Sequence, residues 1–117
     1  MSYDTKLIVV VKSNSIQTSG TQWTEKIAEI DLACMGDGPY SELVRVSPES
    51  TCAIFVNGVE TNRDKHDDIL KEMSIKDVLS ALKKEGNEYR RIKPAVGLLK
   101  GFEKNKWRDL VILHYGH

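Results

Sequence analysis

The chain begins with an apolar run that predicts a buried strand. Residues 7–11 are all apolar and mostly β-branched, and Lys6 and Lys12 bound them. The run is far shorter than the roughly 20 residues that cross a bilayer. A short, continuous apolar run of this kind is typical of a strand that is covered on both faces. We therefore predict a central strand over residues 6–12.

Residues 23–35 fit two periodicities. One set of apolar positions has helical spacing: Trp23, Ile27, Ile30 and Cys34. A second set alternates as in a strand: Ala28, Ile30, Leu32 and Cys34. Thr21 as a cap and Gly36 beyond the end favour a helix, whereas the strict alternation favours a strand that returns antiparallel to the first. We favour the strand and keep the helix as the alternative.

Two further strands are predicted over residues 42–47 and 52–59, as a pair interrupted at Pro48, which lacks an amide hydrogen. Asn57 and Gly58 tolerate the positive φ of a two-residue hairpin turn, which would bring Phe55 close to Glu60. The turn at residues 36–39 lacks the lysine and hydroxyl of a phosphate-binding loop. We interpret it as a simple turn.

A helix is predicted over residues 75–85, because Ser74 can cap it, Asp77 occupies its first turn and Gly86 follows it. A shorter helical turn is expected over residues 65–73, where apolar residues recur at helical spacing.

The last third predicts a helix with two different faces and then a strand. Pro94 suits a first helical turn. The apolar face comprises Ala95, Leu98, Leu99 and Phe102, and the opposite arc comprises Lys93, Gly97, Lys100 and Lys104. Residues 110–113 form a final strand beside the first. The prediction is an α+β fold in one small domain, with a mixed or mostly antiparallel sheet of about four to five strands and two or three helices.

Charge changes this picture, because a chain with no net charge has a basic segment. Residues 83–108 contain nine basic and three acidic residues, a surplus of +6. The first 62 residues carry −4 and the rest +4. The two halves either neutralise each other within one chain or favour self-association as a homodimer.

The basic segment is the candidate site for an anionic partner. Its candidate anion-binding residues are Arg90, Arg91, Lys93, Lys100, Lys104 and Lys106, and Tyr89 and Trp107 are candidates for stacking on bases. The expected partner is a nucleic acid or nucleotide, or else an acidic protein surface. The alternative interpretation is an ordinary solvated lysine face with buried aromatic residues.

An enzymatic alternative depends on a cluster of potential metal ligands. Asp64, His66, Asp67 and Asp68 would serve a small metal-dependent phosphodiesterase or nuclease. Helix capping by these acidic residues is the simpler interpretation. His114 and His117 are interpreted as part of a loose tail. No catalytic residue, metal ligand or cofactor is assigned.

The remaining signals concern the compartment. Cys34 and Cys52 lie in apolar surroundings and are expected to be reduced and buried. The first residues do not resemble a secretory signal, and no apolar stretch is long enough for a membrane helix. The expected location is the cytoplasm.

Overall fold

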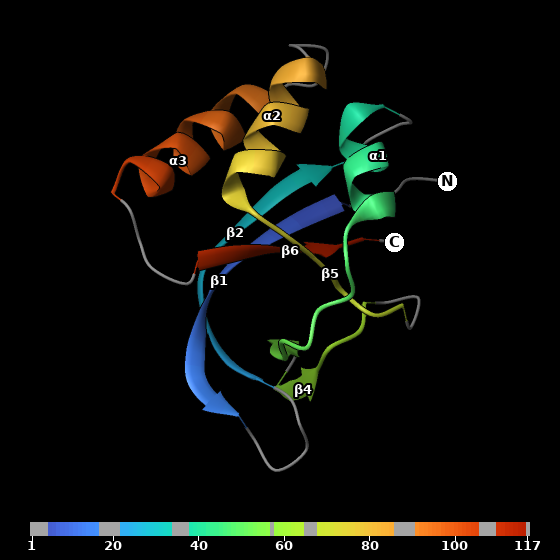
Figure 1. Cartoon of the computed structure of the whole chain (residues 1–117), viewed down its shortest axis with the longest axis vertical. Coiled ribbons are helices and arrows are strands. Elements are labelled where there is room, and N and C mark those ends of the chain that lie inside the picture. The colour runs from blue at the N-terminus through green and yellow to red at the C-terminus, as the bar shows by residue number, and fades with distance from the viewer. Residues whose placement is uncertain are drawn as a thin grey trace.

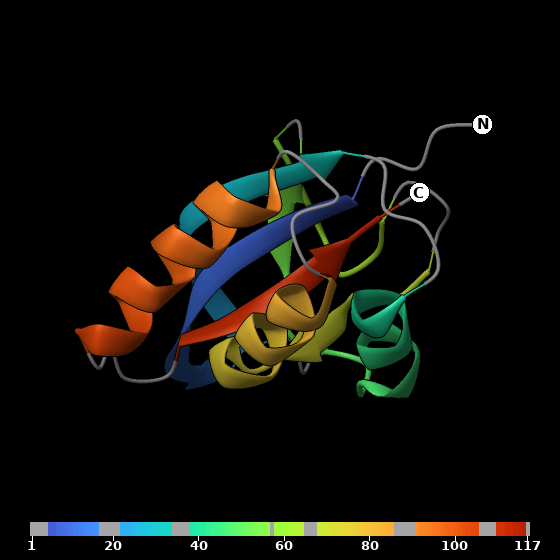
Figure 2. The ribbon, with the colours of Figure 1, turned by 90° about the horizontal axis from the view of Figure 1, so that it is seen from above.

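The fold is an antiparallel sheet with helices on one face and a hairpin on the other. A computed structural model describes residues 5–16, 22–33, 38–56, 58–64, 68–85, 91–105 and 110–116. All three of the helices in these residues lie on the same side of a four-stranded sheet (Figures 1 and 2). The predicted α+β class is confirmed.

The sheet has the strand order β2, β1, β6, β5. Its strands are β1 (Thr5–Ile16), β2 (Gln22–Ala33), β5 (Lys71–Met73) and β6 (Leu110–Tyr115). All of its pairings are antiparallel, and Val9 lies opposite both Ala28 of β2 and Ile112 of β6. The predictions of a central first strand, a strand in place of a helix after residue 22, and a last strand beside the first are confirmed.

The apolar run of β1 has a simple physical explanation. Leu7 and Val9 belong to the apolar cluster beneath the helices, whereas Ile8 and Val10 belong to a second cluster on the other face. All four are at most 5% exposed. The strand is apolar at every position because both of its faces are covered.

Helix α1 (Pro39–Val46) replaces a predicted strand. The prediction over residues 42–47 was wrong because the three apolar residues Leu43, Val44 and Val46 suggested a strand, although Pro39 suits the first turn of a helix. The cap of the helix is remote in sequence, since the carboxylate of Glu85 accepts a hydrogen bond from the backbone N–H of Tyr40 at 2.8 Å.

Helices α2 (Ile75–Glu85) and α3 (Ile92–Lys104) follow the predictions more closely. The hydroxyl of Ser74 accepts a hydrogen bond from the N–H of Asp77 at 3.1 Å, which caps α2 as expected. Between α1 and α2, by contrast, the predicted helical turn over residues 65–73 is wrong. Of its described part, Ile69 makes a β-bridge with Arg63, and Lys71–Met73 forms β5.

The hairpin consists of β3 (Ile54–Val56) and β4 (Val59–Thr61). Phe55 lies opposite Glu60 as predicted, and Gly58 has φ 80°, the positive value that the turn was expected to require. The expected pairing with residues 42–47 is wrong, since those residues lie in α1 or at its end.

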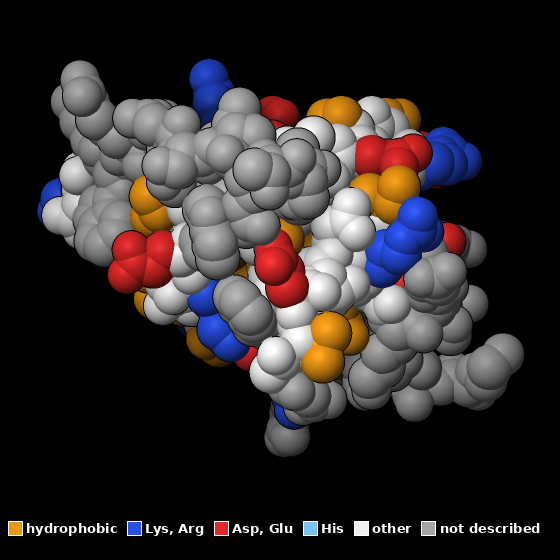
Figure 3. Space-filling view, turned by 90° about the horizontal axis from the view of Figure 1, so that it is seen from below, with side chains coloured by type: hydrophobic (Ala, Val, Ile, Leu, Met, Phe, Trp, Pro, Cys, Tyr) orange, Lys and Arg blue, Asp and Glu red, His pale blue; other side chains and the backbone are white. Residues whose placement is uncertain are grey.

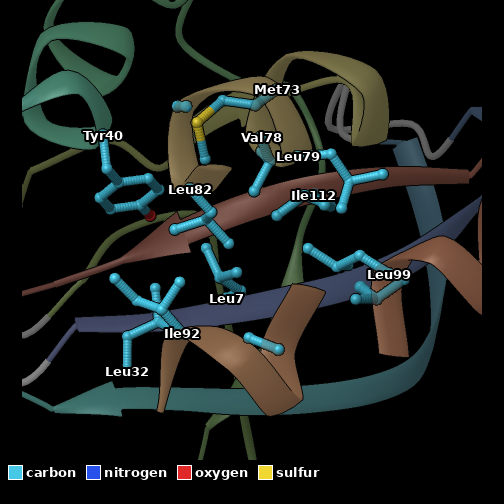
Figure 4. Packing of buried hydrophobic residues seen from close by; sticks show 13 residues of the cluster. Leu7, Leu32, Tyr40, Met73, Val78, Leu79, Leu82, Ile92, Leu99 and Ile112 are labelled. Carbon is cyan, nitrogen blue, oxygen red and sulfur yellow. The ribbon is translucent and has the colours of Figure 1, made fainter. Parts of the chain in front are cut away.

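The larger core lies between the helices and the sheet, and Figure 4 shows how its side chains meet. Leu82 of α2 and Leu99 of α3 lie over Leu7 and Ile112 of the sheet, and all four are fully buried. Burial of each such side chain stabilises the fold by roughly 1.5–3 kcal/mol. Because these side chains pack against the sheet, the other sides of α2 and α3 face the solvent.

Candidate functional site

The lysines of α3 lie on the side of the helix that faces away from the core. Ile92, Ala95 and Leu99 are buried, whereas Lys93, Gly97, Lys100 and Lys104 are exposed. With 100° per residue these four exposed positions share a narrow arc. The structure therefore brings together three of the six predicted anion-binding residues.

One residue of the predicted apolar face is misplaced. Leu98 is 46% exposed, and Ile92 takes its place in the core. The buried arc is centred on Ala95 and Leu99, so Leu98 lies at its margin. Leu98 is therefore an apolar side chain on the flank of the lysine arc.

Two glycines of α3 have no packing role among the described residues. A Cβ atom added at Gly97 or at Gly101 would meet nothing within 4 Å. Each glycine lowers helix stability by about 1 kcal/mol relative to alanine. The packing of the described residues gives no reason for them.

Helix α2 adds lysines that the sequence prediction did not include in the site. Lys76, Lys83 and Lys84 are exposed, whereas Val78 and Leu82 of the same helix are buried. Together α2 and α3 contain six lysines against three acidic residues, which leaves +3. The signal was present in the sequence, since these lysines lie outside the apolar stripe, and the packing of α2 beside α3 puts the two sets of lysines on neighbouring helices.

We call the side of this helix pair that faces away from the sheet the lysine surface. It is defined by the exposed lysines Lys76, Lys83, Lys84, Lys93, Lys100 and Lys104. No ion pair between described residues involves any of the six. The end of the molecule seen from below in Figure 3 differs, because side chains of both charges are mixed there with apolar ones.

Arg91 departs from the expected role. Its guanidinium lies 3.0 Å from the carboxylate of Asp31 on β2, so it neutralises an acidic residue of the first half of the chain. The remaining predicted site residues, Arg90, Lys106, Tyr89 and Trp107, lie outside the described residues.

A second group of polar residues surrounds His114. A cavity of about 460 Å³ is lined by Val44 and Ile69 and by six charged or titratable residues: Glu49, Arg63, Asp64, Asp68, Lys71 and His114. The Nδ1 atom of His114 lies 2.7 Å from the hydroxyl of Tyr40. The prediction of a loose tail at His114 is wrong, because His114 lies in β6 between Leu7 and Lys71. The partner His117 lies outside the described residues.

The titration of this pair is governed by burial. Burial lowers the pKa of His114 to about 4, and the nearby carboxylate of Asp64 opposes that shift. Burial also raises the pKa of Tyr40, whose side chain is 1% exposed. At neutral pH both groups are therefore uncharged, and one hydrogen bond satisfies both polar atoms.

Two acidic residues beside the cavity are joined by hydrogen bonds. Asp64 Oδ1 accepts a hydrogen bond from the N–H of Asp68 at 3.1 Å. His66 and Asp67 of the proposed metal site lie outside the described residues. In the part of the chain that is described, no three His, Cys, Asp or Glu side chains are grouped so that they could hold a metal ion.

A polar network on the other face of the sheet links three segments. Lys12 Nζ lies 2.7 Å from Glu72, and the Ser50 hydroxyl donates to the same carboxylate at 2.9 Å. Burial by itself would raise the pKa of Glu72, but the hydrogen bonds from Lys12 and Ser50 outweigh it and hold the pKa below its usual range. Cys52 beside this network is buried and free as predicted, and Cys34 lies outside the described residues.

Two further observations concern the character of the helices and the comparison of the chain with known proteins. None of the helices in the described residues has the length and apolar character needed to cross a membrane. Comparison with protein-family models, with curated proteins and with solved structures finds no match to this chain.

Proposed function

We propose that the lysine surface binds an anionic partner, with nucleic acid as the first candidate, and that it does so without catalysis. The observation that supports the proposal is the set of six exposed lysines on two adjacent helices, none of them in an ion pair with another described residue. Charges that no neighbour neutralises are available to a ligand.

The lysine surface has the physical properties that binding to phosphates needs. Its helices are held in place by buried leucines, so the lysines project from a rigid base. Neutralisation of phosphates by lysine releases condensed counterions, which drives binding whatever the base sequence. The open space above Gly97 and Gly101 leaves room for a phosphate backbone to approach α3 closely.

A nucleic acid is preferred to an acidic protein because the surface is dominated by lysine. Lysine binds phosphate as a point charge, and its neutralisation of closely spaced phosphates releases condensed counterions, a driving force that the scattered carboxylates of a protein surface do not provide. A cytoplasmic location belongs to the same proposal, since the buried thiol of Cys52 is free.

The experiment that tests the proposal is a binding titration with labelled single-stranded and double-stranded oligonucleotides. The variant Lys93→Gln/Lys100→Gln/Lys104→Gln removes three charges from α3. A control with the same loss of charge changes Lys6, Arg45 and Arg63, which lie outside α2 and α3. We expect the first variant to bind more weakly than the control. Equal binding by the two variants contradicts the proposal, and binding to an acidic polypeptide but not to oligonucleotides redirects it to a protein partner.

A further inference from the structure

Among the described strands, β2 lies at one edge of the sheet. It is 12 residues long and pairs with β1 on one side only, because it ends the strand order of the described residues. Edge strands in proteins are commonly kept short, since their free N–H and C=O groups attract another strand. Strands of about 3–10 residues are typical, so β2 is a long edge.

We propose that β2 pairs antiparallel with β2 of a second copy of this chain, which joins two four-stranded sheets into one. A two-fold axis perpendicular to the sheet relates the copies, so each contact occurs twice. The inference does not depend on the lysine surface, because β2 contributes no residue to it.

A β-bulge in β2 determines which residues can meet across the axis. Val9 lies opposite Ala28 and Val10 lies opposite Lys26, so Ile27 is the additional residue of the bulge. The bulge places Lys26 and Glu29 on the same face of β2, and their side chains lie 3.4 Å apart. A regular strand would place residues three positions apart on opposite faces.

Charge complementarity then selects the register. If the axis passes between Ile27 and Ala28, Lys26 of each copy lies opposite Glu29 of the partner subunit. Both side chains are solvent-accessible, 53% and 39% exposed. Within one chain they pair with each other, and Glu29 also lies 3.4 Å from Lys6, so pairing across the axis exchanges exposed ion pairs without rearrangement of the core. Cross-strand pairs of opposite charge stabilise a sheet, whereas like charges in the same positions destabilise it.

Helix α3 supplies an apolar contact beside the same edge. Its first turn is held to β2 by the Arg91–Asp31 ion pair, and Figure 2 shows α3 running along β2. Leu98 follows Arg91 by two helical turns and therefore lies on the same side of α3. In the proposed dimer the two α3 helices flank the axis, and the 46% exposed side chain of Leu98 is directed toward the partner subunit.

The test exploits charge reversal in two single variants. Lys26→Glu leaves two acidic residues at these positions, and Glu29→Lys leaves two basic ones, so each variant repels its own copies. An equimolar mixture of the two restores opposite charges across the axis. The molar mass of each sample is measured by light scattering on a size-exclusion column, and circular dichroism checks that the exposed substitutions leave the fold intact.

We expect the wild type to be a dimer. The dissociation constant of each single-variant dimer should be about tenfold or more higher than that of the wild-type dimer. The mixture should form a heterodimer. The Glu42→Lys/Arg45→Glu variant reverses an exposed ion pair on α1 and serves as the matched control. It should remain a dimer. A monomeric wild type overturns the proposal, as does a mixture in which both variants remain monomeric. Dimeric single variants show that the copies meet through another surface.

Discussion

The hydroxyl of Tyr40 on α1 lies 2.7 Å from Nδ1 of His114 on β6, and both residues belong to the helix-covered side of the sheet. Tyr40 is 1% exposed, so its hydroxyl is satisfied inside the protein. This bond and the hydrogen bond between Tyr40 N–H and Glu85 join the shortest helix to the rest of the fold. Several stability predictions concern these two contacts.

The Tyr40→Phe substitution should destabilise the protein by about 1–2 kcal/mol. It removes the hydroxyl but keeps the ring, so the loss comes from the hydrogen bond and from the unsatisfied nitrogen of His114. Urea unfolding of the two proteins measures the difference in the free energy of unfolding. The Tyr115→Phe variant is the control, because the Tyr115 side chain packs in the apolar cluster on the other face of the sheet. An unchanged Tyr40→Phe protein would show that the bond does not contribute to stability.

Acid should destabilise the fold over a defined pH range. The pKa of His114 is lowered to about 4 in the folded protein, whereas an unfolded histidine titrates near pH 6.5. The unfolded state therefore binds a proton first, and stability is present above about pH 6.5 and is lost as the pH falls toward 4. The loss attributable to this group is on the order of 3 kcal/mol.

The measurement is urea unfolding at a series of pH values for the wild type and His114→Gln. The variant cannot titrate at this position, so its free energy of unfolding should change less between pH 6.5 and 4. Parallel pH profiles for the two proteins would contradict the assignment to His114.

Glu85→Ala should loosen α1 without disturbing α2. The substitution removes the acceptor for the backbone N–H of Tyr40 at the start of α1, a cap that is typically worth about 1 kcal/mol. Hydrogen exchange should become faster at the amides of α1, relative to a Glu103→Ala control on the exposed side of α3. If the amides of α1 and α2 respond equally, the cap is not local to α1.

The glycines of α3 should be replaceable as far as the fold is concerned. Gly97→Ala and Gly101→Ala each fill open space and improve helix propensity, so each should stabilise the protein by about 1 kcal/mol. Gly58→Ala should destabilise it instead, because φ there is 80°. Thermal unfolding compares the three variants. If Gly97→Ala is stabilising yet weakens oligonucleotide binding, the glycine serves the ligand and not the fold.

The elements that were predicted correctly are those whose sequence signals lie close to them in the chain. The apolar run of β1, the Ser74 cap of α2 and Gly58 between β3 and β4 each lie within a few residues of the structure they specify. Asn57 of the predicted turn lies outside the described residues. Helix α1 was missed because its apolar residues suggested a strand, and its cap is Glu85, which is 45 positions away in the sequence. The local sequence contains a helix signal in Pro39 but not the remote cap.

The candidate sites, too, combine features that one element determines with features that depend on residues remote in the sequence. Helical spacing predicted the lysine arc of α3, since an arc is a property of one helix. The packing of α2, with its own exposed lysines, beside α3 is a tertiary feature, and the contact between Tyr40 and His114 spans 74 positions. The alternation of Leu110, Ile112 and His114 was the one local sign that the histidine lies within a strand.

The most direct test of the lysine surface is the salt dependence of oligonucleotide binding. The logarithm of the association constant should fall linearly with the logarithm of salt concentration, with a slope of about 0.7–0.9 for each phosphate neutralised. Lys93→Gln/Lys100→Gln/Lys104→Gln and Lys76→Gln/Lys83→Gln/Lys84→Gln should each flatten the slope, and the combined variant should flatten it most. A slope that is the same in the wild type and in all three variants would contradict the proposed function.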